Sequence, residues 1–172
     1  MKEKLIQTLK AWPIITLVTV ALCYVTKAGA EAFFGISLES QSTVELVKAL
    51  VKHMCSNVGW HKVFFRDVWA LTLIALQAAI LAPVIEETVF RWILWRLPRP
   101  ALEWVPAITS SALFSAAHYI VMPWPNDAFI ALFFFGLAQC WLYKKTGSLW
   151  CAMVNHALFN TTNLVLLVAL PQ

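Results

Sequence analysis

The chain has 172 residues, of which 60% are hydrophobic and 13% are charged, and its mean hydropathy is +0.71. Soluble domains have about 45–50% apolar and about 25% charged residues, so the composition excludes an ordinary soluble domain and predicts an integral membrane protein. The net charge of +4 is carried mainly at the ends of apolar segments. This distribution is typical of membrane flanks and argues against a nucleic-acid partner.

The first apolar segment, residues 11–25, follows a polar start that contains three lysines. We expect an uncleaved membrane helix here, although Lys27-Ala28-Gly29-Ala30 could also be read as the cleavage site of a signal peptide. Residues 29–66 are the most polar part of the chain. Within them five apolar residues recur at helical spacing: Val44, Val47, Leu50, Val51 and Met54. The pattern predicts either an amphipathic helix at the membrane interface or a surface helix packed on the bundle.

Four further apolar segments follow, at about 68–97, 102–121, 128–143 and 149–170. A membrane helix needs about 20 mainly apolar residues, so we expect the second to fifth spans here. The predicted fold class is all-α: a polytopic membrane helical bundle with about five transmembrane helices plus the interfacial helix. Residues 1–66 would form an anchor helix and amphipathic segment, and residues 67–172 the catalytic helical core.

Basic residues gather in the short loops that would lie on one side of this bundle: Lys2, Lys4, Lys10, Arg96, Arg99, Lys144 and Lys145. The positive-inside rule then places the N-terminus in the cytoplasm and the C-terminus outside. The long loop after the first span is also basic, which argues against this orientation, but long loops count for less in this rule.

The second span contains two adjacent carboxylates and a guanidinium, Glu86, Glu87 and Arg91. A charged group at membrane depth costs at least about 2.5 kcal/mol, so these residues are expected to have a function. Glu87 and Arg91 are four residues apart with the acid first, which favours an ion pair on one helix face. Glu86 is rotated by about 100° from Glu87 and has no local partner, as a general base requires. Pro83, one turn earlier, removes the hydrogen bond to the carbonyl of Ala79 and predicts a kink.

Two other spans carry polar groups that lipid would reject: His118 in the third, and His156 with Asn160 in the fifth. At 1.5 Å per residue from the cytoplasmic ends, Glu86 lies about 15 Å deep and His156 about 12 Å. Asn160 lies about 18 Å deep and His118, which fits least well, about 24 Å. We expect these groups to converge, because each then satisfies another instead of facing lipid.

Together these residue types favour amide hydrolysis without a covalent nucleophile. A carboxylate and a histidine can hold and deprotonate a water molecule. A second histidine and an asparagine amide can donate hydrogen bonds to the oxyanion that forms when the water attacks a carbonyl.

Three motifs in this order resemble those of a known family: Glu86-Glu87-x-x-x-Arg91, Phe114-x-x-x-His118 and His156-x-x-x-Asn160. The chain resembles the CPBP (CAAX protease and bacteriocin-processing) intramembrane glutamic endopeptidases from about residue 68 to residue 170, including Gly147-Ser148-Leu149-Trp150. The resemblance implies that Glu86 is the catalytic glutamate and activates water with His118. It also implies an oxyanion hole made by His156 and Asn160.

The resemblance further implies that Glu87 and Arg91 are structural support. Because Glu86 and His118 would activate the water and the sequence has no metal-ligand motif, we expect no metal or other cofactor. The partners would be the lipid bilayer and a membrane-associated peptide or protein, cut near its anchor in a bacterial cell membrane. A lipid-modified C-terminus, a bacteriocin leader and a C-terminal sorting helix are all candidate substrates.

Two other functions remain open from the sequence alone. Glu86, His118 and His156 could bind zinc with water as the fourth ligand, although the sequence has no HExxH or similar motif. Alternatively, the protein could be a non-enzymatic immunity or scaffold protein whose polar cluster only fastens helices together. Phe114 is predicted to be a packing residue, and Gln139, Asn155 and Asn163 are predicted to form hydrogen bonds between helices.

Overall fold

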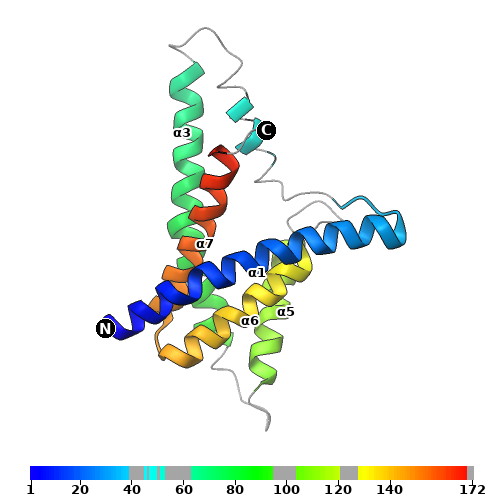
Figure 1. Cartoon of the computed structure of the whole chain (residues 1–172). Coiled ribbons are helices and arrows are strands. Elements are labelled where there is room, and N and C mark those ends of the chain that lie inside the picture. The colour runs from blue at the N-terminus through cyan, green and yellow to red at the C-terminus, as the bar shows by residue number, and fades with distance from the viewer. Residues whose placement is uncertain are drawn as a thin grey trace.

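The structure is a computed structural model that describes residues 1–38, 45, 47–49, 51–52, 63–94, 104–120 and 128–169. Its elements are α1 (Lys2–Phe34), α3 (Val63–Leu76), the π-helical η1 (Gln77–Leu81), α4 (Ala82–Glu87), the π-helical η2 (Thr88–Ile93), α5 (Val105–Ile120), α6 (Ala128–Thr146) and α7 (Leu149–Ala169). Regular structure in these ranges is helical throughout, which confirms the predicted all-α class (Figure 1).

Helix α1 is longer than the apolar segment that predicts it. It has 33 residues and continues through the polar stretch beyond Val25. Alanines at 28, 30 and 32 favour this continuation, since alanine has the highest helix propensity. The helix ends at Gly35, which adopts φ 64° and whose N–H donates to the carbonyl of Glu31 at 3.1 Å. Glycine takes this left-handed conformation without steric cost, so it is a natural terminator.

Residues 63–93 form one continuous helical rod in which α-helical and π-helical segments alternate. In η1 the Ala82 N–H donates to the carbonyl of Gln77, five residues back. In η2 the Leu94 N–H donates to the carbonyl of Val89, again five residues back. Such π segments are rare and often mark functional sites, and here the two flank α4, the short helix that carries both glutamates.

Three helices in the described part of the chain are long and apolar enough to cross a membrane: Lys2–Phe34, Val68–Ile93 and Leu149–Ala169. They correspond to the first, second and fifth predicted spans. The third and fourth predicted spans are also helices, α5 and α6, but they do not meet the same criteria. At 16 residues, α5 is only about 24 Å long. Residues Gln139, Lys144 and Lys145 make α6 less apolar.

Helix α6 is central to the packing and contacts α5, α1 and α7 (Figure 1). The buried apolar core accordingly joins residues of three helices: Ala11, Ile15, Phe114, Ala128, Leu132, Phe135 and Leu142. Gly136 lets α6 approach α5 closely, because a Cβ at this position would lie 2.9 Å from Cβ of Ser111. Helix α7 packs against η1 and α4, and this contact brings the fifth predicted span to the acidic motif.

The predicted interfacial helix lies largely outside the described residues. Within it, residues 45, 47–49 and 51–52 are helical. Glu45 and Lys48 form an ion pair at 3.3 Å, and Val47 is fully buried. The predicted turn at residues 122–127 also lies outside the described part of the chain.

Candidate active site

Glu87 is the most completely engaged carboxylate of the site. Its Oε2 lies 3.2 Å from Nε of Arg91, and both side chains are fully buried. Its Oε1 lies 2.8 Å from Nδ1 of His156 on α7. The predicted ion pair with Arg91 is thus present, while the contact with His156 is an addition that spacing within one helix could not reveal.

Arg91 is held from several sides inside the bundle. Its Nη2 donates to the backbone carbonyl of Gly136 at 3.4 Å, and its guanidinium lies 4.5 Å from the ring centroid of Phe114. A guanidinium over an aromatic face gains a favourable cation–π interaction, which is strongest when water is excluded. Arg91 therefore links η2 to both α5 and α6.

Glu86 has the opposite surroundings. Its side chain is 22% exposed, and its Oε2 is buried without a hydrogen-bond partner among the described residues. That oxygen lies 3.7 Å from Nε2 of His118 and 3.7 Å from Nε2 of His156. One imidazole nitrogen from α5 and one from α7 thus face a carboxylate oxygen that has no hydrogen-bond partner.

Hydrogen bonds at Nδ1 set the orientation of both histidines. Nδ1 of His118 lies 2.9 Å from the carbonyl oxygen of Phe114, one turn earlier in α5. A carbonyl only accepts, so this nitrogen carries the proton, and in a neutral ring Nε2 is a free acceptor. His156 is bound at Nδ1 by Glu87, and its ring packs 5.0 Å from the ring of Phe135. Both Nε2 atoms are thereby directed at Glu86.

Asn160, the fourth residue predicted for the catalytic set, contacts backbone rather than the other side chains of the set. Its Nδ2 donates to the carbonyl oxygen of Ala78 at 2.8 Å. In the π-helical register Ala82 binds the carbonyl of Gln77, so the next N–H would bind Ala78. That next residue is Pro83, which has no N–H. In that register the Ala78 carbonyl would lack a helical donor, and Asn160 supplies one. The prediction that Ala79 loses its partner assumes an uninterrupted α-helix and stays a prediction.

Phe114 is buried in the core as predicted, and it also lies beneath the polar groups. Its ring centroid is 4.6 Å from the ring of His118 and 6.0 Å from that of His156. Phe135 has a comparable place beside His156 and was missed, since one phenylalanine in the phenylalanine-rich α6 carries no distinguishing signal. These rings form an apolar surface against which the two imidazoles pack.

Of the other polar side chains predicted to join helices, some bond across helices and one bonds within its own helix. Gln139 Nε2 donates to Asn155 Oδ1 at 3.2 Å, which confirms the predicted hydrogen bond between helices. Asn163 instead donates to the carbonyl of Phe159 in its own helix, so the prediction for this residue is wrong. An amide near the end of a helix can satisfy itself on the carbonyl one turn back, and sequence spacing does not distinguish the two outcomes.

The described residues contain no group of three or more His, Cys, Asp or Glu side chains arranged to hold a metal ion. These residues do bring together the Glu86 carboxylate and two imidazoles whose Nδ1 atoms are already hydrogen-bonded. The buried Glu87–Arg91 ion pair lies next to them. A carboxylate and an imidazole facing one point can bind and deprotonate a water molecule.

The sequence was compared with known protein families, curated proteins and solved structures. A family described as type II CAAX prenyl endopeptidase Rce1-like matches residues 68–162, which is more than half of the chain. No curated protein and no solved structure matches the chain. The matched range begins in the rod that carries Glu86 and ends just beyond Asn160. The chain therefore belongs to the Rce1-like family of type II CAAX prenyl endopeptidases, a family of proteases, as its motifs predicted.

Proposed function

We propose that this protein is an intramembrane endopeptidase in which Glu86 and His118 activate the water that cleaves a peptide bond near the membrane anchor of the substrate. One observation carries the proposal: Oε2 of Glu86 is buried and unpartnered, 3.7 Å from Nε2 of both His118 and His156. This distance exceeds a direct hydrogen bond, and the water of the proposed reaction would lie beside these atoms, within reach of both the oxygen and a nitrogen. The neighbouring Glu87 differs because it is fully buried, and its two oxygens face Arg91 and His156.

In the proposed reaction, His118 donates from Nδ1 to the Phe114 carbonyl and presents the lone pair of Nε2 to the water. Nε2 of His118 accepts a hydrogen bond from the water, and Glu86 takes one proton from it as the water oxygen forms a bond to the peptide carbonyl carbon. The C–N bond then breaks, and the accepted proton passes to the leaving amine. The products are two peptide fragments, and no bond to the protein forms at any step.

His156 and Asn160 are the proposed oxyanion donors. Because Nδ1 of His156 is bound by Glu87, donation from Nε2 requires both ring nitrogens to carry protons. The imidazolium and the Arg91 guanidinium then share the Glu87 carboxylate, one oxygen each. The Asn160 amide has two hydrogens, of which one is used by the Ala78 carbonyl and the other is available. Such donors stabilise charge that develops only in the transition state.

The proposed setting is a cell membrane with five spans and a cytoplasmic N-terminus, in which residues 1–66 anchor and residues 67–172 catalyse. The three candidate spans support the membrane context. Among the three candidate substrates, the family description favours a lipid-modified C-terminus. The proposed partners are such a membrane-associated peptide and the bilayer, without nucleic acid.

The test compares the C-termini of the membrane proteome in cells that carry the parent protein or Glu86→Gln. Gln keeps the shape and polarity of the side chain but cannot accept the proton, so we expect cleaved C-termini to disappear while the amount of folded protein is unchanged. Glu31→Gln, an exposed glutamate of α1, is the matched control and should behave like the parent. Cleavage by Glu86→Gln within a few-fold of the parent would remove Glu86 from the mechanism.

A further inference from the structure

Gln139 on α6 and Asn155 on α7 form a polar contact inside the bundle that the proposed reaction does not use. Nε2 of Gln139 donates to Oδ1 of Asn155 at 3.2 Å, and both side chains are fully buried. Asn155 directly precedes His156 in the chain. The bond therefore ties the backbone of α7 to α6 next to an imidazole of the site.

The two amides of this pair are only half satisfied. Oε1 of Gln139 and Nδ2 of Asn155 are buried and have no hydrogen-bond partner among the described residues. A buried polar network that is only partly satisfied is less favourable than an apolar contact of the same shape. Methionine and leucine at these positions would fill similar space without unpaired polar atoms. Stability therefore does not explain why amides occupy these positions, and this indicates a need for a contact with a fixed direction.

Polar contacts through the pair close a ring around the site. Glu87 contacts both Arg91 and His156. Arg91 in turn donates to the carbonyl of Gly136, three residues before Gln139 on α6. The bond between the two amides then returns the path to α7. The rod, α6 and α7 are thus joined pairwise by hydrogen bonds or ion pairs close to His156.

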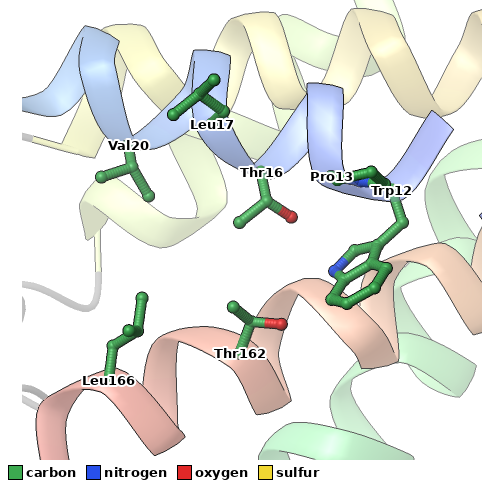
Figure 2. A pocket seen from close by; sticks show the side chains of 7 residues that line it. All are labelled: Trp12, Pro13, Thr16, Leu17, Val20, Thr162 and Leu166. Atoms are coloured by element: carbon green, nitrogen blue, oxygen red, sulfur yellow. The ribbon is translucent and has the colours of Figure 1, made fainter. Parts of the chain in front are cut away.

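The contact with α6 matters because α7 is not tightly packed along the whole of its α1 side. A cleft of about 250 Å³ lies there between α1 and α7, lined by residues of both helices such as Trp12 and Thr162 (Figure 2). Apolar contacts have no preferred direction, so by themselves they let a helix shift along its neighbour. His156 is bound to Glu87 at Nδ1, and a ring held at one atom can still pivot. A fixed α7 backbone is therefore needed to direct Nε2.

We propose that Gln139 and Asn155 are positioning residues of the site. Their hydrogen bond sets the place of α7 on α6 and so keeps Nε2 of His156 directed at the oxyanion. This role rests on the proposed function, in which His156 donates to the developing charge. A displacement of about 1 Å at a reacting group can lower the rate about 100-fold, so a contact that does not touch the substrate can affect turnover strongly.

The experiment replaces both amides at once, in Gln139→Met/Asn155→Leu. Apolar side chains of similar shape remove both partners and leave neither unpaired, so we expect a melting temperature close to that of the parent. The probe is an internally quenched peptide that carries a farnesylated cysteine near its C-terminus. For its cleavage we expect kcat to fall about 10- to 100-fold while KM is unchanged. Gln139→Met alone should lower both kcat and the melting temperature, because Oδ1 of Asn155 is left unpaired.

A conservative exchange tests rescue of the position. Gln139→Asn/Asn155→Gln keeps the combined length of the two side chains and their amide groups, so it should recover most of the lost kcat. Asn163→Ala is the matched control and should leave kcat unchanged, because this amide of α7 donates to Phe159 in its own helix. An apolar double variant with parental melting temperature and parental kcat would overturn the proposal, since the pair would then only fasten two helices. An exchange that recovers the melting temperature but not kcat would also overturn it.

NMR of the full chain with ¹⁵N-labelled histidine gives a readout that needs no turnover. The ring nitrogen signals of His156 report its surroundings, and His156→Gln identifies them by their loss. They should move in the apolar double variant and stay in place in Asn163→Ala. Unmoved signals in the double variant would overturn the positioning role. Cleavage by Glu86→Gln would refute the proposed reaction alone, so the two failures are distinguishable.

Discussion

Glu86 and Glu87 are neighbours in the chain, yet their carboxylates have different partners. One residue of α-helix turns the side chain by about 100°, so Glu87 faces Arg91 and His156 while Glu86 faces the two Nε2 atoms. The sequence could predict the Glu87–Arg91 pair, because both residues lie on one helix at a spacing of four. It could not predict the Glu87–His156 bond, which joins residues 69 apart and depends on how α7 packs.

Glu87→Ala is expected to destabilise the protein by about 3–5 kcal/mol, because Arg91 would remain charged and unpaired in a buried site. Arg91→Ala should have a comparable effect, and the double variant should lose less than the sum. Since Glu87 also orients His156, turnover of the double variant should stay as low as that of Glu87→Ala, although its loss of stability is smaller than the sum. Melting temperatures and turnover in detergent measure both effects, with the exposed Glu31→Ala as control. Strictly additive losses of stability would mean that the two residues do not pair.

At the scale of helices, η1 is the element that sequence reasoning missed. Pro83 signals an interruption of the helix, but the hydrophobic pattern does not distinguish a kink from a π-helical segment that keeps the rod continuous. The register decides which carbonyl is left without a donor, and therefore which atom Asn160 binds. A residue predicted for chemistry thus has a structural bond as well.

Asn160→Ala is expected to lower turnover by about 10²–10³ with little change in substrate affinity, the scale of one lost oxyanion donor. It should also reduce stability by about 0.5–1.5 kcal/mol, because the partly buried Ala78 carbonyl loses its donor. Asn160→Asp should be worse for turnover, since a carboxylate repels both the oxyanion and Glu86. Turnover and melting temperature are measured on the same preparations.

Pro83→Ala separates the two roles of Asn160, because alanine supplies the N–H that proline lacks. In this background Asn160→Ala should cost less stability than in the parent, yet turnover should remain low. If turnover recovers together with stability, Asn160 acts only by positioning the helix and the oxyanion role is wrong.

Gly136→Ala should destabilise the α5–α6 contact by about 1–3 kcal/mol, because the new Cβ would lie 2.9 Å from Cβ of Ser111. The same shift moves the Gly136 carbonyl away from Arg91, so turnover should fall with stability. Gly29→Ala in α1 is the matched control, since nothing lies within 4 Å of its Cβ position. In a helix interior this control should gain about 0.5–1 kcal/mol. Equal melting temperatures of the two variants would show that α5 can yield at Ser111.

For the whole molecule, we expect activity to survive removal of metal ions. Water activation by Glu86 and His118 needs proton acceptors rather than a Lewis acid. Treatment of the purified protein with EDTA or phenanthroline should leave turnover unchanged, and elemental analysis of the same sample should find no stoichiometric zinc. Loss of turnover that zinc restores would favour the zinc alternative instead.

The helical class and the meeting of three motifs could be predicted because both follow from local features, namely apolar length and the cost of polar groups in lipid. His118 was expected to fit least well by depth, yet its Nε2 lies as close to Glu86 as that of His156. The depth was estimated by counting residues along straight, parallel helices, and this estimate fails for His118 because the helices need not be parallel. The cleft between α1 and α7, which Trp12, Thr16 and Thr162 help to line, was not predictable, because residues about 150 positions apart form it.

Two helices of this chain, α1 and α5, offer a bilayer only short segments. Lys10 and Lys27 of α1 enclose 16 uncharged residues, and α5 also has 16 residues, so each covers about 24 Å. A typical hydrocarbon layer is about 30 Å thick, and a short hydrophobic segment is accommodated when the surrounding bilayer thins. If both helices cross a membrane, thinning around them would bring the aqueous surface closer to Glu86. Hydrophobic mismatch would therefore shorten the path by which both water and an anchored peptide reach the carboxylate.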